Sequence, residues 1–429
     1  MRYIAYRKAY SKNEGDISMS SNQASVAVSP SAIKTIFPLL FAISFVHLIN
    51  DTIQSVVPAL FPILKDSLSL SFAQIGLISL MINLTAALLQ PVIGIFSDSH
   101  PKPMMLPIGM LFTLGGVAAL SYATQFWMVM TAVMLIGIGS AVFHPISARV
   151  AYMAAGKRKG TGQSIFQFGG NLGQSLAPIM TAVLFVHTGQ RGVIWFALVV
   201  TIGVIIQFNV AKWYGNQLSL MPVSSSKKAA KPASNLNVTT GKVVFAITIL
   251  MILVFSKNVY IAAISSYYSF YAIEHFGLSV SQAQIVLFVF LAANVIGLLL
   301  GGMLADRFSR RSLIWFSILG TAPFALLLPY ANLTFSIILI FFAGLILASA
   351  FSVILVYANE LLPGRVGLVS GVFFGMAFGL AGIGSAVLGN LADEMGIEFV
   401  IRCTSYLPLL GMLTILLPSD RKGQAEQIS

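Results

Sequence analysis

Two titratable side chains stand one helical turn apart in a strongly apolar stretch near the start of the chain. His47 and Asp51 lie on one face of any helix through that stretch, and Asn50 and Gln54 flank them as candidate substrate-binding residues. A carboxylate beside an imidazole at low dielectric can exchange a proton near neutral pH. We expect this pair to couple protons, because an ionisable group inside a membrane is costly. A static His–Asp hydrogen bond is the alternative.

Two further ionisable residues fall inside apolar stretches. Lys257 requires an acidic partner such as Asp51 or an anionic ligand there, and a structural Lys–Asp pair suits the sequence equally well. Lysine also loses its proton readily when buried, so Lys257 could take part in coupling. His144 precedes Pro145, which frees a backbone carbonyl and bends a helix. His144 is therefore expected either to contact substrate or to be satisfied by that break.

Polar residues without charge complete the candidate binding set. Gln167 and Asn171 lie one turn apart beside several glycines, where they would contact substrate or, as the pattern slightly favours, bond to another helix. Tyr267 and Tyr357 are also candidates, although tyrosines commonly anchor helices at membrane interfaces.

The composition predicts a membrane protein. Of 429 residues, 57% are apolar and only 9% are charged, against about 25% charged in soluble proteins. The single Cys403 excludes an intramolecular disulfide and a cysteine-based metal site. The chain contains no GxSxG, HExxH or P-loop motif, so we expect no enzyme activity, no cofactor, no metal and no ATP-driven transport. The net charge of +12 fits contact with anionic lipid, not nucleic acid.

Apolar stretches of span length predict an all-α, polytopic protein with twelve transmembrane helices in two six-helix halves. We expect an N-terminal arm (1–33), a first half (34–213), a basic linker (214–242), a second half (243–417) and a tail (418–429). The expected spans are 34–60, 72–97, 104–124, 126–154, 162–187, 192–213, 243–272, 280–304, 311–330, 333–361, 366–391 and 397–417.

Basic residues gather on one side of this arrangement. The arm, the linker with Lys227, Lys228 and Lys231, and the tail fall on the side that also holds most of the loop lysines and arginines. By the positive-inside rule that side is cytoplasmic, so both termini are expected in the cytoplasm. The even number of spans agrees.

An internal repeat relates the two halves. Gly94 and Asp98 correspond to Gly302 and Asp306 at an offset of 208 residues, each pair in a short loop between two spans. Small residues repeat as well, because Gly169 and Gly173 match Gly375 and Gly379 at an offset of 206. Symmetry predicts two cytoplasmic latches with swapped charges, in which Asp98 meets Arg149 and Glu360 meets Arg307 or Arg310.

The loop GMLADRFSRR (302–311), with its degenerate copy GIFSDSHPK (94–102), resembles the signature of the major facilitator superfamily. In that family the loop locks the cytoplasmic side in one state. Ser309 stands where the family usually has glycine, and the first copy lacks the arginine after Asp98. The antiporter pattern of the fifth span is present only loosely, with Gln174 where proline would stand.

Several long stretches are similar to the fosmidomycin resistance proteins of bacteria. They include HLINDTIQS (47–55), FHPISARVA (143–151), QSIFQFGGNLG (163–173) and ILVYANELLPGRVGLVSG (354–371). The resemblance, over about 34–418, implies proton-driven efflux of fosmidomycin or a related drug by a multi-pass monomer of the bacterial inner membrane. Proton symport of a small organic anion stays open, because no motif sets the direction of coupling.

Overall fold

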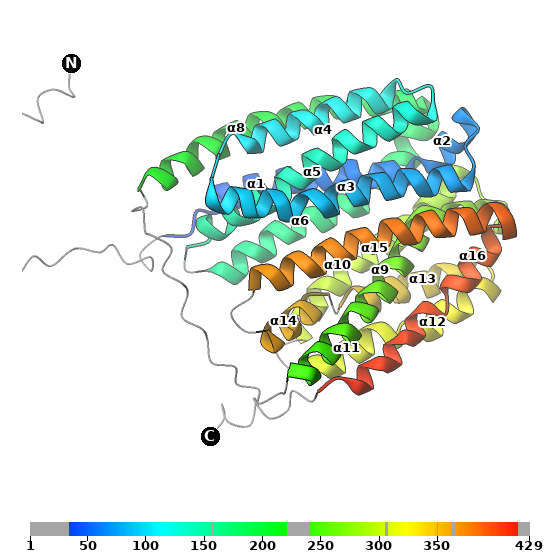
Figure 1. The fold of residues 1–429 in the computed structure, drawn as a ribbon. Helices are drawn as coiled ribbons and strands as arrows, with labels where there is room; N and C mark the ends of the chain where they lie inside the picture. The colour runs from blue at the N-terminus through cyan, green and yellow to red at the C-terminus, as the bar shows by residue number, and fades with distance from the viewer. Residues whose placement is uncertain are drawn as a thin grey trace, which may run out of the picture.

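The computed structural model describes residues 34–156, 158–220, 240–304, 308–349, 351–362 and 366–418, and within these ranges every regular element is a helix. The predicted arm and tail, apart from Pro418, lie outside the described residues, as do Lys227, Lys228 and Lys231 in the linker. The long helices run side by side in one bundle, and the two halves of the chain occupy opposite sides of it (Figure 1).

The described residues of the first half form eight α-helices and two short turns of other helical types. They are α1 (Phe37–Ala59), α2 (Phe61–Leu68), α3 (Phe72–Ser99), α4 (Met105–Ser121), α5 (Phe126–Ala154), α6 (Lys159–Met180), the π-helical η2 (Thr181–Phe185), α7 (Val186–Thr188), the 3₁₀ turn η3 (Gln190–Ile194) and α8 (Trp195–Leu220).

The second half has the same plan. It comprises α9 (Thr240–Phe276), α10 (Val280–Leu304), α11 (Arg310–Leu319), α12 (Ala322–Leu327), the 3₁₀ turn η4 (Leu328–Tyr330), α13 (Leu333–Ala348), α14 (Phe351–Leu361), α15 (Val366–Met395), α16 (Ile397–Thr404) and the 3₁₀ helix η5 (Leu407–Leu416).

Ten helical stretches of the described residues are long and apolar enough to cross a membrane. The shorter apolar helix α4 and the more polar α6 run alongside them in the bundle (Figure 1). α6 carries Gln163, Gln167, Asn171 and Gln174, which explains its lower apolar character. Two of the twelve predicted spans are therefore not among these ten, because α4 is short and α6 is polar.

Helix ends follow local signals in the sequence. α5 and α10 have the ends expected from the sequence, whereas α8 continues to Leu220 and α9 begins at Thr240, so both ends of the interval predicted as a linker are helical. α3 begins at Phe72, after Ser71, which caps the helix: the Ser71 hydroxyl accepts the N–H of Gln74, and the Gln74 side chain accepts the N–H of Ser71.

Glycines bring α6 onto the backbone of α1. A methyl group on Gly169 would lie 2.1 Å from the carbonyl oxygen of Ser44, and one on Gly173 would lie 2.3 Å from that of Leu48. Such contact requires residues without a side chain. The equivalent Gly375 and Gly379 of α15 instead face Ala87 of α3, in the other half, with room for a methyl group.

Among the described residues, hydrogen bonds join the two halves at the end of the bundle where α3 begins and α15 ends. There the carboxylate of Asp393 accepts the backbone N–H groups of Phe72 at 2.8 Å and Ala73 at 2.7 Å. The hydroxyl of Ser281, at the start of α10, donates to the carbonyl oxygen of Ala182 at 3.1 Å. A methyl group on Gly389 would lie 2.3 Å from the carbonyl oxygen of Phe72. This end is therefore tightly closed.

Candidate functional site

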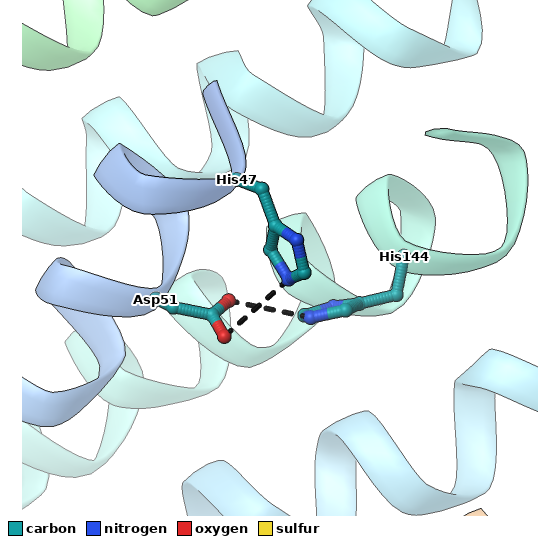
Figure 2. Close-up of side chains that lie close together, drawn as sticks. All are labelled: His47, Asp51 and His144. Carbon is teal, nitrogen blue, oxygen red and sulfur yellow. Dashed lines mark ion pairs between the residues drawn. The ribbon is translucent and has the colours of Figure 1, made fainter. Parts of the chain in front are cut away.

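Asp51 on α1 lies between two histidines. Its Oδ2 atom is 3.4 Å from Nε2 of His47, one turn earlier on the same helix, and its Oδ1 atom is 3.3 Å from Nε2 of His144 on α5. Figure 2 shows both imidazoles pointing at the one carboxylate from different helices. We call these three residues the His–Asp–His trio.

Backbone carbonyl groups fix the orientation of both imidazoles. Nδ1 of His47 lies 2.7 Å from the carbonyl oxygen of Phe166 on α6, and Nδ1 of His144 lies 3.0 Å from that of Ser140. A carbonyl oxygen only accepts hydrogen bonds, so Nδ1 of His47 carries the hydrogen. Nδ1 of His144 also lies 3.0 Å from the hydroxyl oxygen of Ser140, which can donate or accept. Each Nε2 is thereby left facing the carboxylate of Asp51.

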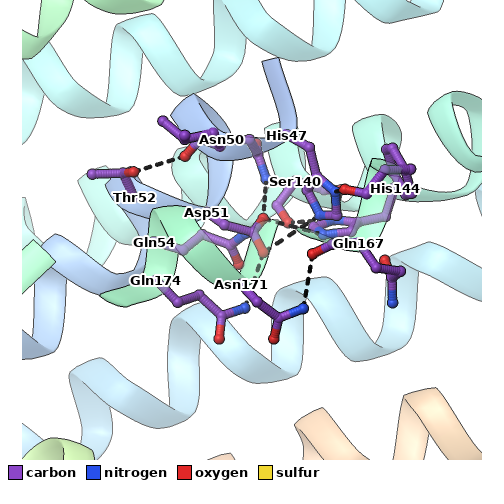
Figure 3. A network of polar contacts seen from close by, with 12 residues as sticks. His47, Asn50, Asp51, Thr52, Gln54, Ser140, His144, Gln167, Asn171 and Gln174 are labelled. Carbon is purple, nitrogen blue, oxygen red and sulfur yellow. Dashed lines mark hydrogen bonds and ion pairs between the residues drawn. The ribbon is translucent and has the colours of Figure 1, made fainter. Parts of the chain in front are cut away.

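Amide side chains also reach the carboxylate of Asp51 (Figure 3). Oδ1 accepts from Asn50 at 3.1 Å and from Gln54 at 3.5 Å, both on α1. Oδ2 accepts from Nε2 of Gln174 on α6 at 2.9 Å. Each carboxylate oxygen therefore has at least one amide donor and one imidazole nitrogen beside it.

The trio lies largely inside the first half. His47, Asn50 and Asp51 are buried, whereas the side chain of His144 is 21% exposed and Gln174 is exposed. The ring of Phe166 stacks on His47 with 4.1 Å between centroids. The polar cluster is thus open at its His144 and Gln174 edge.

Gly170 of α6 provides the space that the trio occupies. A methyl group there would lie 2.5 Å from two atoms of the His47 ring and 2.9 Å from Oδ2 of Asp51. No side chain larger than hydrogen fits without displacing them. The two Nε2 atoms and the carboxylate lie within 4.8 Å of one another, a spacing that would also suit one divalent cation.

Of the other predicted binding residues, Gln167 and Asn171 border the trio in the polar network of Figure 3. Lys257 is buried in α9, and among the described residues the ion partners of Asp51 are the two histidines, not Lys257. Asn171 donates to the carbonyl oxygen of Gln167 on its own helix at 2.8 Å.

Tyr267 and Tyr357 are both buried. The hydroxyl of Tyr267 donates to the carbonyl oxygen of Ser385 at 2.6 Å, and that of Tyr357 to the carbonyl oxygen of Pro418 at 2.7 Å. Both tyrosines therefore hold the second half together through these contacts.

The predicted cytoplasmic latches are described only in part. Nη1 of Arg149 donates to the carbonyl oxygen of Ser97 at 3.0 Å, which places Arg149 against the end of α3. Gly94 faces Pro145 of α5, Gly302 lies in α10 and Arg310 begins α11. Asp306, Arg307 and the side chains of Asp98 and Glu360 lie outside the described residues.

Sequence reasoning missed three members of the site. Gln174 continues the polar face of Gln167 and Asn171 at helical spacing, so that signal was present in the sequence. Ser140 stands one helical turn before His144, and this spacing indicates that the two side chains lie side by side. Gly170 had none beyond its place in a glycine-rich helix, because the need for space depends on which residues of α1 it meets.

Comparisons with known proteins agree on one family. The model of the Major Facilitator Superfamily matches residues 40–385 and 250–429. The chain is 49% identical, over 93% of its length and 97% of the relative's, to the fosmidomycin resistance protein of Escherichia coli (strain K12). It is 43% identical, over 90% and 94%, to the uncharacterized MFS-type transporter YfnC of Bacillus subtilis (strain 168).

Solved structures share the fold. A bacterial homologue of the human lysosomal transporter Spinster, in an inward-facing and occupied conformation, superposes with a TM-score of 0.71 at 15% identity. The match covers 89% of this chain and 96% of that one.

Proposed function

The chain belongs to the Major Facilitator Superfamily, and we propose that it is a proton-coupled exporter of fosmidomycin or related small molecules. It is a membrane transporter, not an enzyme. The relative that is 49% identical carries the name fosmidomycin resistance protein, which supports the substrate. The structure supports proton coupling through one observation, the orientation of the His–Asp–His trio.

That orientation calls for a proton between the three side chains. Nδ1 of His47 carries hydrogen, so a neutral His47 would present the lone pair of Nε2 to Oδ2 of Asp51. Lone pairs that face each other in a buried site repel, and a proton on Nε2 of His47 turns that contact into a charge-assisted hydrogen bond. The trio therefore suits a group of side chains that binds and releases a proton during transport.

Export then proceeds by alternating access. We propose twelve spans with both termini in the cytoplasm, counting α4 and α6 with the ten long helices. The tightly closed end of the bundle, where Asp393 meets α3, is then the outer end. In this state the trio would exchange its proton with the cytoplasmic side, and separation of the outer end would expose it to the other side.

Lys257 is the proposed contact for an anionic group of the drug. It corresponds to Asp51 at the offset of 206 residues that relates Gly169 to Gly375, so the two halves place opposite charges at equivalent positions of α1 and α9. A buried ammonium group attracts a phosphonate or carboxylate. Drug and proton would thus be bound by different halves.

The test uses everted membrane vesicles with an acidic interior and a pH-sensitive dye. Antiport predicts that fosmidomycin added outside collapses the gradient in vesicles with the protein and not in empty-vector vesicles. Proton symport of an organic anion predicts a response only when the anion is loaded inside. A response that disappears with a metal chelator would show a cation in the trio in place of a proton, and no response to drug from either side would reject the proposal.

A further inference from the structure

We propose that Gln174 is a positioning residue that holds the Asp51 carboxylate in the orientation in which it faces both histidines. The inference rests on the proposed proton coupling and assigns a role to a residue outside the trio. Its first support is distance. At 2.9 Å, the contact from Nε2 of Gln174 to Oδ2 is shorter than any other described contact to the carboxylate.

The second support is the direction of the contact. Asn50, Gln54 and His47 reach Asp51 along its own helix, so they move with it. Gln174 reaches it from α6, the helix whose Phe166 carbonyl group orients His47. α6 thereby sets the rotation of the carboxylate and of one imidazole together.

The third support is accessibility. Gln174 is exposed, whereas the carboxylate that it holds is buried. Its amide nitrogen donates to Asp51, so the amide oxygen of the same group remains available as an acceptor at the edge of the cluster.

The variants are chosen to remove the donor and keep the size of the side chain. Gln174→Met and Gln174→Glu both lose the N–H group that contacts Oδ2. The matched control is Gln163→Met, at an exposed position near the start of α6, three turns from Gln174. Drug-evoked proton movement is measured in everted vesicles, and drug exchange without a proton gradient is measured in the same vesicles.

The inference predicts that both Gln174 variants lose about tenfold or more of the drug-evoked proton rate, the scale expected for a lost hydrogen bond to a charged group. Gradient-free exchange stays near the wild-type rate, and Gln163→Met behaves as wild type in both measurements. A proton rate like that of wild type in the Gln174 variants would overturn the inference alone. Parallel loss of both rates would also overturn it, since a structural role has that signature. A wild-type protein without any drug-evoked response would overturn the proposed function first.

Discussion

Asp393, near the end of α15, accepts the backbone N–H of Phe72, the first residue of α3, at 2.8 Å and so joins the two halves. The same carboxylate takes the N–H of Ala73. These groups belong to the first turn of a helix, where N–H groups have no partner within the helix and the helix dipole favours a negative charge. The contact stabilises the state in which this end is closed.

Asp393→Asn is therefore expected to populate the state in which this end is open. The amide keeps only one acceptor oxygen and loses the charge, and a several-fold shift of the equilibrium is expected for this exposed contact. The measurement is the distance between spin labels on Ser67→Cys and Met395→Cys, both exposed, in a Cys403→Ser background. Glu394→Gln, at the exposed neighbouring position, is the control. Identical distance distributions in all three proteins would refute a role of Asp393 as an outer latch.

Gly170→Ala is expected to disable export. The added methyl group would lie 2.5 Å from the His47 ring, so the trio must shift. We expect at least about a tenfold lower rate of drug-evoked proton movement, because small displacements of positioned groups cost that much or more. Gly115→Ala is the control, since its methyl group would meet nothing within 4 Å. Equal rates in the two variants would mean that the space beside His47 is not needed.

Lys257→Met is expected to change selectivity for charge. If the ammonium group binds an anionic drug, its loss should raise the KM for anionic substrates about tenfold or more, the scale of one charge-assisted contact. The KM for neutral or cationic substrates should change much less. Competition of each substrate class against fosmidomycin export measures this. Uniform loss across all charges would indicate that Lys257 is structural.

Much of the fold was predictable because membrane helices are long and apolar. α5 (Phe126–Ala154) and α10 (Val280–Leu304) have the expected ends, and the family comparison confirms the superfamily. The ends of helices were less predictable where they do not coincide with a change in the polarity of the sequence. α8 continues to Leu220, beyond the end of the apolar stretch, so hydropathy alone placed the end of this helix too early.

The site was predictable in its core and not in its surroundings. His47 and Asp51 are one turn apart on one helix, and helical geometry alone brings them together. His144 and Gln174 reach Asp51 from α5 and α6, and their convergence depends on how those helices pack, which periodicity does not specify. Charge alone allows a pairing of Asp51 with Lys257, and among the described residues the ion partners of Asp51 are His47 and His144.

The most direct test of the account measures protons released when drug binds. Purified protein in weakly buffered detergent solution is mixed with fosmidomycin, and the pH change and the heat of binding are recorded for wild type and Asp51→Asn. The account predicts proton release in proportion to drug bound by wild type, and drug binding without proton release by the variant. Equal proton release by both proteins would contradict the claim that Asp51 and its two histidines hold the exchanged proton.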